Sequence, residues 1–140
     1  METGPHRKLL DRAVSLYRNK EHKFAEHIAN TILKKTDKYN AEIFLLLGSI
    51  HFDRGFELYN KGKDTEQGLR EYKIAEYMYE RGLEHIPEIL GDEQRENKLV
   101  KADILYGLAM LYDRSDRISK FNKILDYCRQ STELTKGEWG

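Results

Sequence analysis

The chain has 140 residues, a length that suits one domain with a single core. It carries 24 Lys and Arg against 24 Asp and Glu, so it lacks the basic excess of a general nucleic-acid binder. It also has no run of about 18 apolar residues that would predict a membrane span, and its single cysteine, Cys128, excludes an internal disulfide. We therefore expect a cytoplasmic domain that binds neither nucleic acid nor membranes. Because Trp139-Gly140 gives no clean structural ending, excision from a longer chain is an open alternative.

The first third of the chain predicts two short helices. Apolar residues recur at intervals of three and four between Pro5 and Asn19, as one buried helical stripe requires. A polar break at 19–21 precedes a second stripe from Phe24 to Leu33, which fades through residues 34–37. The lysines at the end of this stripe oppose the negative end of the helix dipole.

The middle of the chain predicts a longer helical hairpin. Its first helix begins near Asn40 and continues to about Asn60, where 61–63 breaks it. Asp64 then starts the next helix with Gln67 three residues later, a spacing similar to a capping box. We expect this helix to run to about Ile86 and to stop at Pro87. Two helices of roughly 20 residues each would give an antiparallel hairpin on the order of 30 Å long.

The last third predicts a third hairpin. Its first helix covers about 93–113, with Gly91-Asp92 as a second cap, and 114–116 forms the turn. The sixth helix reaches at least Gln130 and is defined by its apolar residues, which are Ile118, Phe121, Ile124, Leu125 and Cys128. Since no segment alternates like a strand, we predict an all-α fold of six helices in three consecutive hairpins.

The middle hairpin interleaves large and small side chains at helical spacing, which lets two helices cross closely. The residues that carry this pattern are Ala41, Glu42, Phe44, Leu47, Gly48, Phe52, Gly55, Tyr72, Ala75, Tyr79, Gly82 and Pro87. The pattern resembles the tetratricopeptide repeat family, whose unit is a helix pair of about 34 residues. The third hairpin is similar, and the first matches in looser spacing. We expect a partner helix to press its backbone against Gly48.

The resemblance implies about three repeats with lengthened helices, at approximately 6–39, 40–88 and 92–132. About 15 extra residues fall between Gly55 and Tyr72, and about 12 between Pro87 and Ala102, relative to the repeat period. If the residues of the first insertion are divided between the two helices of the middle hairpin, both helices become longer. We therefore expect this hairpin to project beyond its neighbours.

A superhelix of such hairpins has a concave wall made by the first helix of each pair, and this wall can hold a peptide or a helix. The resemblance places twelve residues there as a partner-binding groove: Tyr17, Glu42, Leu45, Leu46, Ser49, Phe52, Asp53, Asp103, Tyr106, Met110, Asp113 and Arg114. Leu10 and Val14 would extend it. The wall is apolar and acidic, which favours a protein or peptide partner with apolar anchors or basic residues.

Family members that hold the acidic C-terminal tails of chaperones resemble one another in a set of Lys, Asn and Arg on this wall. This chain offers no such cation or amide, which argues against chaperone tails as partners; those positions hold Leu10, Val14, Leu46, Asp103 and Gly107. The third predicted helix also carries a second apolar stripe, formed by Leu45, Ser49, Phe52, Phe56 and Tyr59. Either a partner occupies this stripe or the chain covers it itself.

Catalytic and metal-binding patterns are missing from the sequence. His22 and His27 are five residues apart, which misses the one-turn spacing of two ligands on a helix. We read His51 as a packed core residue and Cys128 as a buried packing group. The sequence thus predicts a protein that is not an enzyme and holds no cofactor or metal.

The predicted function is a non-catalytic scaffold or adaptor that binds a partner segment in the groove. Two alternatives stay open. The chain could be a structural subunit that self-assembles, for example as a homodimer, through its extended middle hairpin. It could also be a regulatory domain of an enzyme or of a larger complex.

Overall fold

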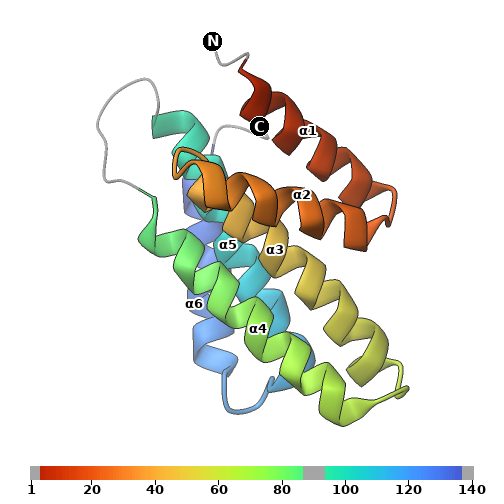
Figure 1. Ribbon diagram of the computed structural model, residues 1–140. Helices are drawn as coiled ribbons and strands as arrows, with labels where there is room; N and C mark the ends of the chain where they lie inside the picture. The colour runs from red at the N-terminus through yellow and green to blue at the C-terminus, as the bar shows by residue number, and fades with distance from the viewer. Residues whose placement is uncertain (1–3, 87–93, 137–140) are drawn as a thin grey trace.

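The computed structural model describes residues 4–86 and 94–136, and this part of the chain is built from helices joined by short turns, without a strand (Figure 1). The predicted all-α fold is therefore confirmed. None of the helices in these two ranges combines the length and the apolar composition that crossing a membrane requires.

The first hairpin consists of α1 (Pro5–Arg18) and α2 (His22–Lys35), each of 14 residues. Pro5 stands at the beginning of α1, where a missing backbone N–H costs no hydrogen bond and the fixed φ suits the helix. The tight turn between the helices places Lys20 in the left-handed region with φ 64°. Both helices agree with the predicted ranges to within about two residues.

The middle hairpin consists of α3 (Asn40–Gly55), the π-helical turn η1 (Phe56–Asn60) and α4 (Thr65–Glu84). The chain thus stays helical to Asn60, as predicted, although the last five residues have the wider π winding. Asp64 caps α4 by accepting a hydrogen bond from the Gln67 backbone N–H at 3.1 Å, as its spacing predicts. Pro87, the expected stop, lies outside the described residues.

The third hairpin consists of α5 (Gln94–Ser115) and α6 (Phe121–Leu134). The turn comes later than the predicted 114–116, because α5 continues to Ser115, whose hydroxyl bonds back to the Leu111 carbonyl at 2.7 Å. Ile118 consequently lies in the turn before α6 with 93 % of its surface exposed, so its assignment to the sixth helix was wrong. The expected cap at Gly91-Asp92 lies outside the described residues.

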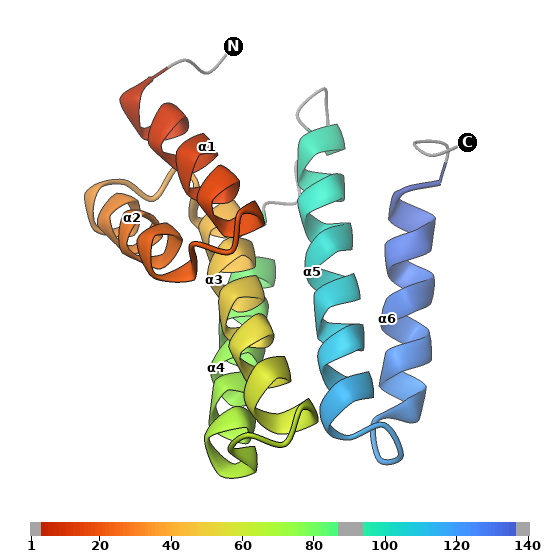
Figure 2. The ribbon, with the colours of Figure 1, turned by 90° about the vertical axis from the view of Figure 1, so that its right-hand side faces the viewer.

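Each helix packs against its hairpin partner, and the hairpins follow one another in chain order, consistent with an α–α superhelix (Figure 2). Together α3 and η1 span 21 residues and α4 spans 20, so the middle hairpin is extended relative to the first. It does not project beyond the third hairpin, because α5 has 22 residues and its turn reaches the same end of the molecule.

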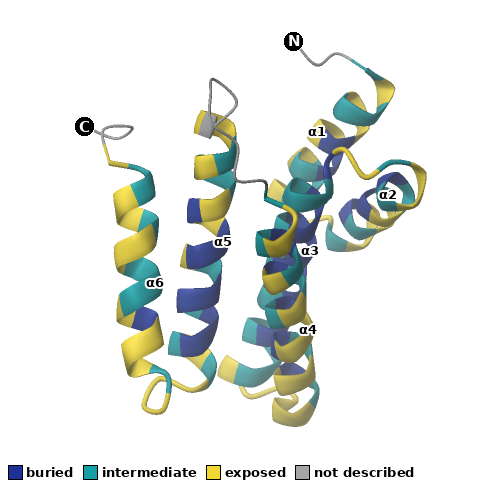
Figure 3. Ribbon diagram, turned by 90° about the vertical axis from the view of Figure 1, so that its left-hand side faces the viewer, coloured by how far each residue is buried: buried dark blue, intermediate teal, exposed yellow. Residues whose placement is uncertain are grey.

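Two groups of buried residues form the core, and α3 lies between them (Figure 3). The first group joins α1 and α2 to α3 through fully buried side chains such as Leu10, Ile32 and Ile43. The second joins α4, α5 and α6, with Tyr72, Ile104 and Leu108 at its centre. Leu45 and Phe52 of α3 pack against this second group, so α3 contributes to both.

Candidate functional site

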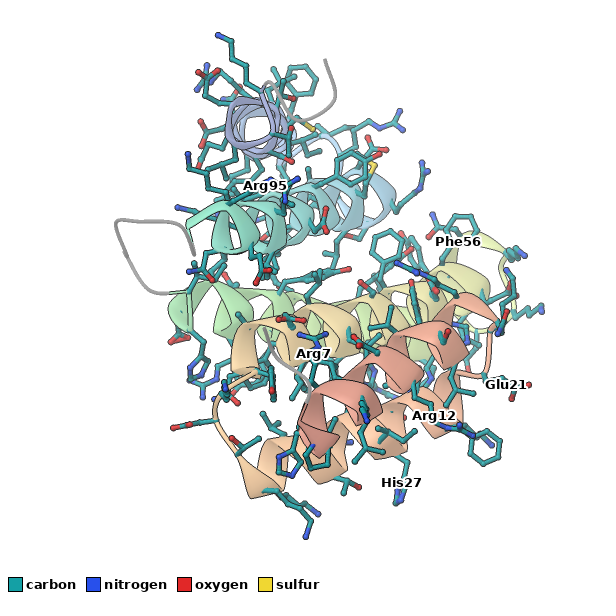
Figure 4. All side chains as sticks on the ribbon, turned by 90° about the horizontal axis from the view of Figure 1, so that it is seen from above. Arg7, Arg12, Glu21, His27, Phe56 and Arg95 are labelled. Atoms are coloured by element: carbon teal, nitrogen blue, oxygen red, sulfur yellow. The ribbon has the colours of Figure 1, made fainter. Side chains whose placement is uncertain are left out.

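A hollow of about 560 Å³ opens between α1 and α5, with α3 as its floor. Seen from above, α3 lies between these two helices (Figure 4). We call this hollow the groove. Its lining comprises Val14, Tyr17, Arg18, Glu42, Leu45, Leu46, Ser49, Phe52, Asp53, Tyr79, Val100, Asp103, Tyr106, Gly107 and Met110. The first helices of all three hairpins therefore contribute to one surface.

Ten of the twelve residues that the sequence placed on the concave wall line the groove, and Val14 joins them. Asp113 and Arg114 do not. They lie at the C-terminal end of α5, where Asp113 pairs with Arg117 at 2.8 Å and the Arg114 guanidinium lies over the Phe56 ring at 5.8 Å. Leu10, expected to extend the wall, is fully buried in the first core group instead.

Three lining residues were missed: Arg18, Tyr79 and Val100, whereas Gly107 had been placed on the wall as one of the positions compared with the chaperone-binding set. Val100 is three residues from Asp103, so helical spacing on α5 could have found it. Arg18 follows Tyr17 at the end of α1. Tyr79 carried no such signal, because it belongs to the second helix of its hairpin, which the repeat pattern places away from the wall.

Tyr79 reaches the groove from α4 by passing between two glycines. A Cβ atom built on Gly48 would lie 2.6 Å from the Tyr79 ring, and one on Gly107 would lie 2.7 Å from the ring carbon that bears the hydroxyl. Gly48 therefore makes room for a ring rather than for a helix backbone, which corrects the sequence prediction. Because α3 and α5 each have a glycine at this point, the Tyr79 ring fits between them and its hydroxyl reaches the groove floor.

The polar groups of the floor lie close to one another. The hydroxyl of Tyr79 and that of Ser49 are 3.1 Å apart, and the Tyr17 hydroxyl lies near the side chains of Ser49 and Asp53. Asp53 also accepts a hydrogen bond from His22 Nε2 at 3.0 Å. Burial, followed by the proximity of Asp53, raises the pKa of Tyr17, and burial likewise raises the pKa of Tyr79. Both phenols therefore stay protonated and able to donate at neutral pH.

The three acidic residues of the groove differ in their partners. Glu42 receives two hydrogen bonds from the Arg7 guanidinium, at 2.9 and 3.1 Å, and Figure 4 shows Arg7 between α1 and α3. Asp53 accepts a hydrogen bond from His22 and lies beside the Tyr17 hydroxyl. Asp103 has no hydrogen-bond or ion-pair partner among residues 4–86 and 94–136. Although much of Asp103 is exposed, the groove wall removes enough water from its carboxylate to raise its pKa.

The second apolar stripe of α3 divides into two parts. Leu45, Ser49 and Phe52 line the groove. Tyr59 is partly buried by the chain itself, with its ring centroid 5.9 Å from that of Tyr72. The Phe56 ring, labelled in Figure 4, has the cations of Lys61 and Arg114 within 5.9 Å of its centroid. The chain thus partly covers the Tyr59 end of the stripe itself, and occupation of the other part by a partner stays a prediction.

His51 is buried, and Cys128 packs against the second core group. His51 is 8 % exposed and its Nδ1 lies 2.7 Å from a carboxylate oxygen of Glu71, so it is the packed core histidine that its position predicts. Cys128 is half-buried rather than buried, which corrects the prediction for it. Within the described ranges, no group of three or more His, Cys, Asp and Glu residues is arranged to hold a metal ion.

Comparisons of the chain with protein-family models, with curated proteins and with solved structures found no match. The resemblance to the tetratricopeptide repeat therefore stays a prediction from the residues themselves.

Proposed function

We propose that this protein is a non-catalytic adaptor that docks a segment of a partner polypeptide in the groove. The observation that carries the proposal is the lining itself: residues from α1, α3 and α5 meet around one hollow with an apolar floor. Its volume falls in the range of binding sites rather than of packing defects. The floor is made of side chains on helices, which hold their positions better than side chains on loops.

The chemistry of the lining supports docking over catalysis. The hydroxyls of Ser49 and Tyr79 share a hydrogen bond, the Tyr17 hydroxyl lies beside Asp53, and the two phenols hold their protons. Most of the remaining surface is aliphatic or aromatic, so apolar anchors of the partner would supply most of the affinity.

The order of the helices supports membership of the tetratricopeptide repeat family as part of the same proposal. In that family the first helix of each pair forms the concave wall, and here the groove is lined by α1, α3 and α5. Tyr79 is the exception, because it belongs to the second helix of the middle pair.

The test uses a matched pair of tyrosines. Tyr106 is 55 % exposed and lines the groove, whereas Tyr77 is 57 % exposed on α4 and lies outside it. Both can be changed to glutamate without opening the core. Affinity purification from the cells of origin, followed by mass spectrometry, identifies the proteins that bind the wild type. We expect Tyr77→Glu to retain these proteins and Tyr106→Glu to lose them.

Circular dichroism and thermal melting of both variants should stay near the wild type, since neither tyrosine is buried. Phe52 is less suitable for this test, because its ring packs against Tyr72 with centroids 5.6 Å apart and its loss would disturb the core. Equal recovery of every partner by the two tyrosine variants would contradict the assignment of the groove.

A further inference from the structure

The polar groups of the groove restrict the backbone conformation of an occupant. An extended peptide carries unpaired N–H and C=O groups and needs partners for them in the groove. Here the walls are helices whose backbone groups are already bonded, and the hydroxyls of Ser49 and Tyr79 share a hydrogen bond. The Tyr17 hydroxyl lies beside Ser49 and Asp53. A helical segment satisfies its own backbone and presents only side chains to an apolar floor.

The charges of the groove restrict the side chains of the occupant. Glu42 pairs with Arg7, which also pairs with Asp11. Asp53 pairs with His22 beside the Tyr17 hydroxyl. Asp103 is the one carboxylate of the lining that has no partner in the described part of the chain, and its surroundings disfavour its charge. Arg18, on the other wall, is exposed at the end of α1 and keeps its hydration. A cation from the occupant would therefore gain most beside Asp103.

We propose that the segment docked in the groove is an amphipathic helix that lays its apolar face on α3 and places a lysine or arginine against Asp103. This inference rests on the proposed function and specifies the partner. The apolar contacts would come from Leu45, Leu46 and Phe52 below and from Tyr106 and Met110 on the α5 side. Anchors at i, i+3, i+4 and i+7 of the occupant would form the matching face.

The probe is a displayed library of random peptides about 16 residues long, enough for four helical turns. Selection is carried out in parallel on the wild type, Asp103→Lys and Asp113→Lys. Asp113 is the matched control, because it lies on the same helix but outside the groove and pairs with Arg117 at the surface. Circular dichroism first confirms that the three proteins have the same helical content.

With the wild type and with Asp113→Lys, we expect enriched peptides that combine a helical apolar stripe with Lys or Arg at one fixed position beside it. With Asp103→Lys, that position should change to Asp or Glu. Binding of a wild-type peptide, measured by fluorescence anisotropy, should weaken on the order of tenfold in Asp103→Asn, since one charge-assisted hydrogen bond is lost.

The helical conformation is tested on the selected peptide itself. Proline at the first helical position should leave binding within about threefold, while proline in the interior should abolish it, because only the interior proline breaks a helix. Equal tolerance of both prolines would overturn the helical occupant in favour of an extended one.

The outcomes separate this inference from the proposed function. Selected peptides that require Tyr106 and yet lack a fixed Lys or Arg would overturn the role of Asp103 and leave the groove as a docking site. Peptides that keep the same basic residue when they are selected on Asp103→Lys would do the same. Selections that yield no peptide dependent on Tyr106 would contradict the groove itself, and with it both proposals.

Discussion

At the scale of single residues, Tyr79 connects the core to the groove. Its ring is 3 % exposed and lies against Gly48 of α3 and Gly107 of α5, while its hydroxyl reaches Ser49 at the floor. Since glycines face the ring from two helices, neither helix can carry a larger residue there without displacing it. The position of the Tyr79 hydroxyl at the groove floor thus depends on the space that the two glycines leave for its ring.

Replacing Gly48 tests this packing. Gly48→Ala places a methyl group 2.6 Å from a ring whose hydroxyl end also lies against Gly107, so we expect a loss of about 2 kcal/mol in the free energy of unfolding. Gly48→Leu should cost about 3 kcal/mol or more. Urea unfolding measures both. In a Tyr79→Leu background, Gly48→Ala should cost much less, because the clash is gone. Additive effects in this double-mutant cycle would contradict the contact.

Asp103 gives a stability prediction with a definite pH dependence. Burial raises its pKa above the ordinary 3.8, so the folded protein binds this proton more tightly than the unfolded chain does. The ionised carboxylate then costs stability at pH 7, and the cost disappears as the pH falls below the ordinary value. We expect Asp103→Asn to raise the melting temperature at pH 7 by less than about 4 °C, and to have no effect near pH 3.

The matched variant here is Asp113→Asn, whose carboxylate accepts a hydrogen bond from Arg117 at 2.8 Å. Because this exposed ion pair contributes little, Asp113→Asn should leave the melting temperature at pH 7 unchanged or slightly lower. A lower melting temperature for Asp103→Asn at pH 7 would show that the carboxylate is stabilised in the folded protein.

Much of the groove lining could be predicted from the sequence, because wall positions recur at fixed helical spacing on first helices. Leu45, Ser49 and Phe52 are examples, and Asp103, Tyr106 and Met110 repeat them on α5. Tyr79 could not be predicted, since its approach depends on the gap that two distant glycines leave. The sequence also could not predict that Asp103 lacks an ion-pair partner in the described part of the chain. Spacing within one helix does not show which carboxylate meets a cation on another helix.

At the scale of elements, the end of α3 departs most from a regular helix. The π winding of η1 brings the Tyr59 backbone against Gly68 of α4. Asn60 then accepts a hydrogen bond from the Tyr72 hydroxyl and donates one to the Arg114 carbonyl at 3.1 Å. The tip of the middle hairpin is thereby tied both to α4 and to the end of α5.

Two glycines of α4 offer a paired test of this tip. A Cβ on Gly68 would lie 2.5 Å from the Tyr59 backbone nitrogen, whereas one on Gly82 would meet the terminal methyl of Ile104 at 2.8 Å. Backbone cannot yield as a side-chain end can. Both substitutions gain the same helix propensity, so the clash decides the difference between them. We therefore expect Gly68→Ala to lower the free energy of unfolding in urea by about 2 kcal/mol and Gly82→Ala to be nearly neutral. Equal effects would contradict the close approach.

Most helix bounds could be predicted, and the exceptions have local causes. Periodicity and the Asp64 cap located α1 to α4 within about two residues. The turn after α5 was misplaced because Ile118 continues the apolar spacing of α6 but lies in solvent. The π winding had no signal in the sequence, since it depends on contacts between Asn60 and residues of α4 and α5.

At the scale of the molecule, α3 is the element on which the two core groups meet. The first hairpin packs mainly on α3, while the third packs on α4 and on the other side of α3. In such an array each hairpin is stabilised chiefly by its neighbours. The groove spans this junction, so its shape depends on how firmly the first hairpin is held.

The position of α3 between the two core groups predicts which helices lose protection when a core residue is changed. Ile32 of α2 and Ile43 of α3 are both fully buried in the first core group, so changing either to alanine should cost 2–5 kcal/mol, by about the same cavity effect. By hydrogen exchange, Ile32→Ala should reduce the protection of amides in α1 and α2 and leave α5 and α6 unchanged, because the first hairpin can open alone. Ile43→Ala should reduce protection in all helices, since α3 supports both neighbours. If Ile32→Ala lowers protection equally in α2 and α6, the molecule unfolds as one unit, and the first hairpin is not free to move as one wall of the groove.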